Sequence, residues 1–136
     1  MSEFVDSNIF IRLITADDPA RMARCLDLFK RAERGDIQLV TSESIVGEAI
    51  YVLSSPVTYR MDREDIATRL RPILELKGLR IDHKRAILLA LDRYEQTRLD
   101  FEDCVVVAHT IRMELNGIYS YDRGFDRVSG VQRIEP

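Results

Sequence analysis

The residues that decide the fold lie at the start of the chain, where residues 4–14 read FVDSNIFIRLI. The apolar pair Phe4–Val5 predicts a short buried strand, which ends at Asp6. Ser7 and Asn8 follow, both small and polar, and an apolar pattern then resumes. An acid and two small polar residues between hydrophobic runs call for a functional explanation, which depends on the rest of the chain.

Short apolar segments alternate with helical patterns over the remaining residues. Further strands are expected at 37–40, 79–81, 118–121 and 131–134. Helices are expected between them, with start signals at Asp18-Pro19, Ser42, Asp62, Asp82 and Asp100. Because the strands have no polar face, we expect a parallel sheet covered on both sides. The sequence thus predicts one α/β domain over residues 1–136, with its chemistry outside the carboxyl ends of the strands.

The composition is that of an ordinary globular protein. The 136 residues are 46% hydrophobic and 32% charged, which excludes a wholly disordered chain. No apolar run approaches the roughly 18–20 residues of a membrane span, and the first residues do not resemble a signal peptide, so a cytoplasmic location without membrane contact is expected. The net charge of −3 argues against a broadly basic surface. Cys25 and Cys104 are expected to be reduced and buried.

Four acids stand at positions that an amphipathic pattern does not explain. Asp6 and Asp122 follow the first and fourth expected strands. Glu48 interrupts a mainly apolar helix, and Asp103 lies in the first turn of the helix that starts at Asp100. Strand ends and the first turns of the following helices adjoin in a doubly wound sheet, so we expect the four acids to converge on one cleft.

Such a cleft predicts a metal site. Several carboxylates close together cannot all stay ionised without a cation. All-oxygen ligation selects Mg²⁺ or Mn²⁺ over Zn²⁺. Two such ions about 4 Å apart would hold the attacking water and the leaving oxygen of a phosphodiester.

Each acid taken alone also has an ordinary explanation. Asp103 could be a helix-terminal acid favoured by the helix dipole, and Asp122 could be a turn residue. Asp6 could cap a short helix, and Glu48 could simply face water. The metal site is indicated by the four together, not by any one of them.

Four motifs carry a family resemblance. They are FVDSNIFIRLI (4–14), SESIVGEAIYVL (42–53), DFEDCVVVAHTIRM (100–113) and IYSYDRGFDRVSGVQRI (118–134). In this order and spacing, the chain resembles PIN-domain ribonucleases of the VapC toxin type over essentially its whole length. The resemblance implies a three-layer α/β/α fold, with a short parallel sheet of four to five strands flanked by helices.

The resemblance also implies a role for individual residues. Asp6, Glu48 and Asp103 match three metal-binding acids, and Asp122 matches a fourth that helps to hold a second metal or its waters. These four are the expected catalytic residues and the ligands of Mg²⁺ or Mn²⁺. Residues expected to support them without binding the metal are Ser7, Asn8, Asp100, Ser120 and Asp126. Residues considered as substrate-phosphate contacts, with salt pairing as the alternative, are Arg123 and Arg12.

Two positions depart from the family pattern, and two of the supporting acids have second readings. Cys104 follows Asp103 where alanine is usual, and Gly124 stands where many relatives carry a polar or acidic residue. Asp126 also reads as a surface acid, and Asp100 reads first as a helix cap.

The expected activity is hydrolysis of RNA phosphodiester bonds, in which His83 and His109 take no part. The resemblance implies a small antitoxin partner and a homodimer. The alternatives are a freestanding PIN nuclease in RNA processing and an inactive PIN-fold binding module. A phosphohydrolase of the haloacid-dehalogenase type also places an acid after its first strand, but it usually has a second acid where this chain has Asn8.

Overall fold

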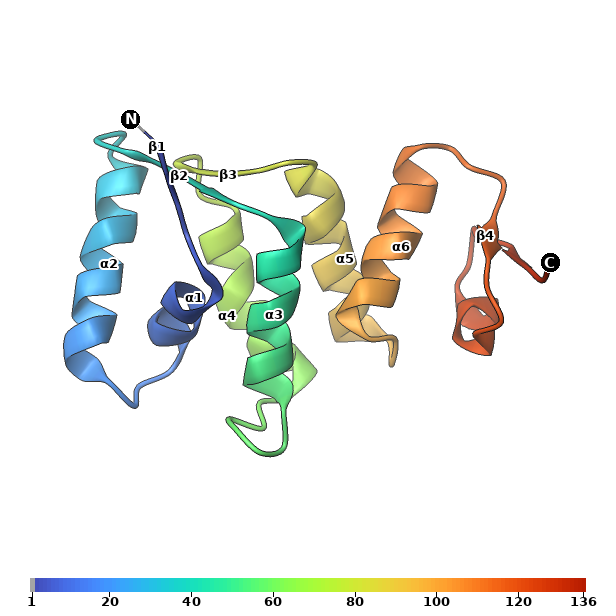
Figure 1. The fold of residues 1–136 in the computed structure, drawn as a ribbon, viewed down its shortest axis with the longest axis horizontal. Helices are drawn as coiled ribbons and strands as arrows, with labels where there is room; N and C mark the ends of the chain where they lie inside the picture. The colour runs from blue at the N-terminus through green and yellow to red at the C-terminus, as the bar shows by residue number, and fades with distance from the viewer. Residues whose placement is uncertain (1) are drawn as a thin grey trace. The chain divides into compact units, whose positions relative to one another are not determined.

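The computed structural model describes residues 2–136. The chain divides into two compact units, Met1–Lys84 and Arg85–Pro136 (Figure 1). The organisation as a single domain stays a prediction. Within residues 2–136, no helix combines the length and the apolar character that crossing a bilayer requires.

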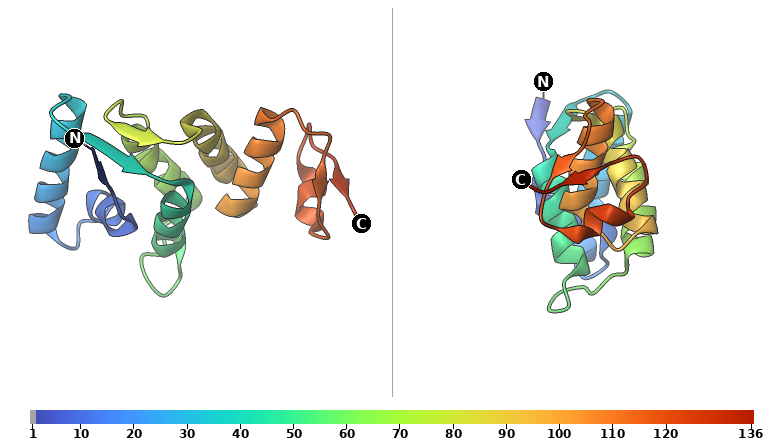
Figure 2. Two further views of the ribbon diagram at one scale, coloured as in Figure 1. Left: turned by 45° about the horizontal axis from the view of Figure 1, so that its top comes forward. Right: turned by 90° about the vertical axis from the view of Figure 1, so that its right-hand side faces the viewer.

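The first unit combines a parallel sheet with four helices. Its elements are β1 (Ser2–Phe4), α1 (Ser7–Ile14), α2 (Pro19–Glu33), β2 (Gln38–Thr41), α3 (Glu43–Ser54), α4 (Arg63–Leu74) and β3 (Leu79–Ile81). The strand order is β1-β2-β3, and both pairs are parallel. The chain passes from β2 almost directly into α3 (Figure 2). Parallel strands joined by helices confirm the predicted α/β class.

The second unit is built from two helices and a small strand pair. Its elements are α5 (Lys84–Gln96), α6 (Phe101–Arg112), β4 (Ile118–Tyr119), the 3-10 helix η1 (Arg123–Arg127) and β5 (Arg133–Ile134). In β4 and β5 the pairing is parallel, with Ile118 opposite Arg133 and Tyr119 opposite Ile134.

The strands differ from the sequence prediction in two ways. A single sheet of four to five strands was expected, whereas the described residues form a three-stranded and a two-stranded sheet, because β4 pairs with β5. The first strand was also expected to be buried. All three residues of β1 are exposed, with Phe4 at 61%, and burial begins only at Val5, immediately after the strand, which is 2% exposed.

Most helices start where the sequence predicted. Asp18, Ser42 and Asp62 each accept a hydrogen bond from the backbone N–H three residues later, at 3.1, 3.4 and 2.8 Å, which satisfies a donor that the helix itself cannot pair. Helix α5 is the exception, since it starts at Lys84. Asp82, the expected cap, lies in a turn with His83, whose φ is 56°.

Each unit has its own apolar core. In the first unit, Phe10 is fully buried and meets the edge of Phe29 at a centroid distance of 6.0 Å, and burial of such a ring contributes about 2–3 kcal/mol. In the second unit, a small cluster of apolar side chains includes residues of α6, β4 and η1. Its buried members are Val107, Ile118, Phe125 and Val128. Cys25 and Cys104 are buried and form no disulfide within residues 2–136, as expected.

Candidate functional site

Asp6 lies between β1 and α1 and caps α1. Its Oδ1 accepts a hydrogen bond from the Ser7 backbone N–H at 2.8 Å. The backbone before it is fixed, because the Val5 N–H donates to the Val40 carbonyl at 2.8 Å and the Thr41 hydroxyl donates to the Val5 carbonyl at 2.9 Å. Asp6 is exposed, and its Oδ2 has no hydrogen bond within residues 2–136. One carboxylate oxygen is thus held by the backbone while the other is accessible.

The other predicted residues of the first unit are Ser7, Asn8 and Glu48. Ser7 is 8% exposed, so it supports Asp6 through its backbone N–H. Asn8 is exposed. Glu48 is exposed on α3, the helix that packs against α1. The first unit therefore supplies two accessible carboxylates, Asp6 and Glu48, on elements in contact with each other.

Three acids come together in the second unit. Asp100 caps α6, and its Oδ1 accepts a hydrogen bond from the Asp103 backbone N–H at 3.2 Å. Asp103 is half-buried. Burial, a side-chain hydrogen bond with Asp100 and the negative charges of Asp100, Asp122 and Glu102 raise the pKa of Asp103 to about 6. The negative charges of these neighbouring acids therefore act on Asp103, whereas the convergence of all four acids on one cleft stays a prediction.

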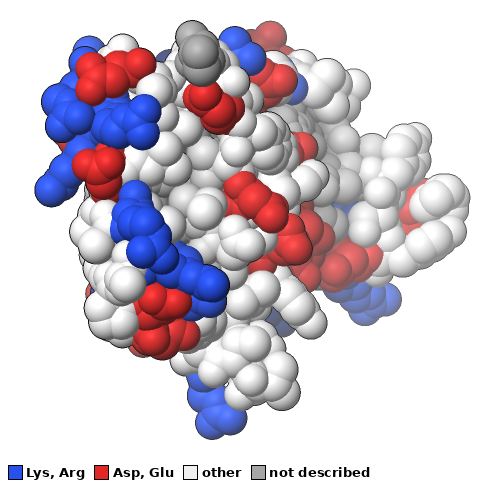
Figure 3. Space-filling view, turned by 60° about the vertical axis from the view of Figure 1, so that its left-hand side comes forward, with Lys and Arg blue, Asp and Glu red and all other residues white. Residues whose placement is uncertain are grey.

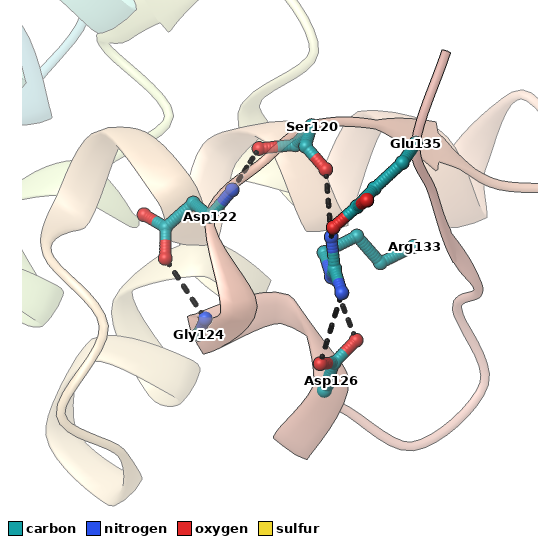
Figure 4. Close-up of polar contacts among 6 residues, drawn as sticks. All are labelled: Ser120, Asp122, Gly124, Asp126, Arg133 and Glu135. Atoms are coloured by element: carbon teal, nitrogen blue, oxygen red, sulfur yellow. Dashed lines mark hydrogen bonds and ion pairs between the residues drawn. The ribbon is translucent and has the colours of Figure 1, made fainter.

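Asp122 is oriented by short backbone contacts (Figure 4). Its Oδ1 accepts from the Gly124 N–H at 2.8 Å, and its own N–H donates to the Ser120 hydroxyl at 2.9 Å. Its Oδ2 has no hydrogen bond within the described part of the chain, so Asp122 repeats the arrangement of Asp6. A Cβ on Gly124 would lie 3.0 Å from Asp122 Oδ1 and 3.2 Å from a Leu99 methyl carbon. A side chain at this position would therefore require Asp122 or Leu99 to shift by a few tenths of an ångström.

Arg133 holds the chain beside Asp122, and the sequence analysis did not single it out. Its guanidinium donates to both oxygens of Asp126 at 2.8 and 3.3 Å, to Glu135 at 2.8 Å and to the Ser120 carbonyl at 3.0 Å (Figure 4). Its side chain is only 12% exposed. Asp126 was predicted to support the metal ligands. In the structure both of its carboxylate oxygens accept hydrogen bonds from Arg133, and this ion pair lowers the pKa of Asp126.

The two arginines considered as phosphate contacts differ in their surroundings. Arg12 forms an ion pair with Asp17 at 3.0 Å, so the salt-pairing alternative describes it. Asp17 also accepts from the Tyr59 hydroxyl at 2.7 Å, and its pKa is lowered by the hydrogen bonds from Tyr59 and Thr15 and by the charge of Arg12. Arg123 is exposed.

The motifs and the fold are matched by a comparison with known families. The model of the PIN domain matches residues 4–131. The chain belongs to the PIN-domain family. The match spans all four predicted acids, and membership confirms the PIN-like α/β fold that the sequence predicted.

The solved structures that are similar to this PIN-domain protein include one of low sequence identity. It is VapC20 of Mycobacterium tuberculosis, described as a toxin that cleaves the sarcin-ricin loop. The identity is 20%, the alignment covers 98% of this chain and 99% of that chain, and the TM-score is 0.39. No curated protein matches the chain.

The carboxylates of this PIN-domain protein fit a hard divalent cation by their chemistry. Mg²⁺ and Mn²⁺ prefer oxygen ligands, and Asp6, Asp103 and Asp122 each offer carboxylate oxygens. Within residues 2–136, no group of three or more His, Cys, Asp or Glu side chains meets the geometry of a metal site. The assignment of four metal ligands therefore stays a prediction.

Proposed function

We propose that this PIN-domain protein is an endoribonuclease that depends on Mg²⁺ or Mn²⁺, with Asp6, Glu48, Asp103 and Asp122 as its metal ligands and catalytic residues. The observation that carries the proposal is the concentration of acids around Asp103 in a member of this family. Like charges held together destabilise one another, and a divalent cation would relieve that repulsion.

The chain's own residues prepare these acids for a ligand. Asp6 and Asp122 each use Oδ1 to accept a backbone N–H, which fixes the carboxylate and leaves Oδ2 for a cation. Asp100 fixes the first turn of α6 and so the position of Asp103. When bound, the metal would lower the pKa of a water and stabilise negative charge on the phosphate.

Neither histidine is assigned a role in the reaction. His109 Nδ1 accepts a hydrogen bond from Arg112 Nε at 3.2 Å within α6, and His83 lies in the turn before α5. The proposal therefore assigns activation of the water to the carboxylates and their metal.

The proposed biological role is that of the toxin in a toxin–antitoxin pair. It rests on the motifs at residues 4–14 and 118–134, which resemble those of VapC-type proteins. The expected partners are RNA as substrate, a small antitoxin protein and a second copy of the chain. Growth arrest on induction, relieved by a protein encoded immediately upstream, would support this role; induction without effect on growth or RNA would favour a freestanding nuclease.

The activity is tested with purified protein and a structured RNA in Mg²⁺, in Mn²⁺ and in EDTA. We expect cleavage with either metal, no cleavage in EDTA, and no cleavage by Asp103→Asn. Glu64→Gln, an exposed acid on α4, is the matched control and should cleave like the wild type. Turnover of p-nitrophenyl phosphate without RNA cleavage would indicate a phosphatase, and RNA binding without cleavage in any metal would indicate a binding module. Either result would refute the proposal.

A further inference from the structure

A groove between α1 and α2 plays no part in the proposed function. Its volume is about 860 Å³, and residues of both helices line it. Four of its lining residues are arginines, and one is an acid, Asp27. We call it the arginine groove, after Arg12, Arg21, Arg24 and Arg31. Figure 3 shows Lys and Arg side chains gathered over the part of the molecule that carries α2.

Two of these arginines have their charge satisfied within the protein, and two do not. Arg12 pairs with Asp17 at 3.0 Å, and Arg21 pairs with Asp18 at 3.4 Å. Arg24 and Arg31 are exposed and have neither an ion pair nor a side-chain hydrogen bond within residues 2–136. The groove thus offers two guanidinium groups that are available to an anionic ligand.

The arginines of α2 form a line. Arg21, Arg24 and Arg31 are separated by three and seven residues, spacings that place side chains on one face of a helix. At 1.5 Å per residue, the line is about 15 Å long, a length that several consecutive phosphates of one strand occupy. Guanidinium groups bind phosphate oxygens with two parallel hydrogen bonds. A linear polyanion fits this arrangement better than a single small anion does.

The groove is also lined by a residue close in the chain to Asp6, one of the proposed catalytic residues. Asn8 lines it and lies two residues after Asp6 on the helix that Asp6 caps. The apolar side chains of Ile9 and Leu28 also line it, and they offer non-polar surface to a base or sugar. The row of arginines and the position of Asn8, on the helix that Asp6 caps, favour the nucleic-acid substrate over an acidic peptide as the occupant.

We infer that the arginine groove binds the sugar–phosphate backbone of single-stranded RNA, with Arg24 and Arg31 as its principal phosphate contacts, and directs the strand toward Asp6. This inference rests on the proposed function, since it names the path of the substrate to the same acids. It assigns binding to residues outside the four family motifs.

The test compares the double variant Arg24→Ala/Arg31→Ala with the wild type. Binding of a labelled oligouridylate of about 12 nucleotides, within the usual range of single-strand site sizes, is measured in EDTA as a function of salt. We expect the affinity to fall on the order of tenfold at low salt, and the slope of log K against log salt to decrease by about 1.4, or about 0.7 for each lost phosphate contact. Circular dichroism melting checks that the variant is folded.

Arg69→Ala/Arg85→Ala is the matched control, because both arginines are exposed on other helices. It should bind like the wild type. Equal losses in the two double variants would indicate non-specific attraction and overturn the inference. Unchanged binding by the groove variant would overturn it as well, as would poly-L-glutamate binding to the groove more tightly than RNA does.

Cleavage by the wild type in Mg²⁺ is measured in parallel, so that the two proposals fail separately. If the groove variant still cleaves RNA with an unchanged KM, the inference about the groove is overturned and the proposed nuclease activity stands. Groove-dependent RNA binding without cleavage in any metal supports the groove and refutes the nuclease.

Discussion

Arg133 and Asp126 form a two-point ion pair across seven residues, with Nε–Oδ1 at 2.8 Å and Nη2–Oδ2 at 3.3 Å. The same guanidinium donates to the Ser120 carbonyl, and the Ser120 hydroxyl accepts the N–H of Asp122. Arg133 is therefore a positioning residue for Asp122, acting through the strand end that carries it.

Replacement of Arg133 should affect both stability and metal use. Arg133→Ala removes a donor to the Ser120 carbonyl and two partly exposed ion pairs, so we expect a loss of about 1–2 kcal/mol in the free energy of unfolding. Arg133→Lys keeps the charge but not the two-point geometry, so part of the loss should remain. If Arg133 positions Asp122, the Mg²⁺ concentration for half-maximal cleavage should rise more than the KM for RNA. Arg127→Ala, an exposed neighbour, should change neither; an equal effect of Arg127→Ala would contradict this role.

Divalent metal should stabilise the fold if the acids bind it. At a Mg²⁺ concentration about 100 times the dissociation constant, the expected gain is about 2.7 kcal/mol, measured as a rise in Tm over the EDTA sample. Asp103→Asn and Asp122→Asn should each abolish most of this rise. Glu64→Gln should keep it. A rise of the same size in all three variants would show that the metal binds elsewhere.

Gly78 is required by packing. A Cβ there would lie 2.2 Å from the carbonyl oxygen and 2.9 Å from the Cβ of Ala32, so Gly78→Ala should force α2 and β3 apart and cost about 1–3 kcal/mol. Gly130 is the comparison, because it has a φ of +87° but no atom within 4 Å of a new Cβ; alanine there should cost about 1 kcal/mol of backbone strain. Chemical denaturation measures the free energy of unfolding of both variants. If Gly78→Ala were as stable as Gly130→Ala, or more stable, the result would be inconsistent with this packing.

Stability should fall in acid partly because Asp126 becomes protonated. The hydrogen bond and charge of Arg133 lower the pKa of Asp126 from its usual 3.8, so the folded state favours the ionised form. This stabilisation is present above pH 3.8 and is lost as the pH falls through the lowered value. The difference in Tm between the wild type and Asp126→Asn should therefore shrink below about pH 4. A difference that grows in acid would have the wrong sign.

The sequence predicted the features that local chemistry determines. Asp18, Asp62 and Asp100 cap helices where expected, because an N-cap depends on a side chain and a backbone N–H only three residues apart. The parallel pairing and the PIN family were also predicted correctly, since strand spacing and motifs are visible in one chain. The place of Asp103 in the first turn of the helix that Asp100 caps was predicted as well.

Features that depend on contacts between distant residues could not be predicted in this way. The ion pair of Arg133 requires the chain reversal between η1 and β5, and nothing local to Arg133 indicates it. The exposure of Phe4 depends on which parts of the chain pack against β1, and an apolar pair does not reveal that.

The central claim is that acids far apart in the sequence serve one metal-dependent reaction. The most direct test is kcat/KM for RNA cleavage in Mg²⁺ by the wild type, Asp6→Asn, Asp103→Asn and the double variant, all checked for an unchanged fold. Residues that act as one unit are strongly non-additive. We predict that each single variant loses about a thousandfold or more and that the double variant loses little further. The claim would be contradicted if each single variant lost only a little of its kcat/KM and the two losses multiplied in the double variant. Full activity in either single variant would contradict it as well.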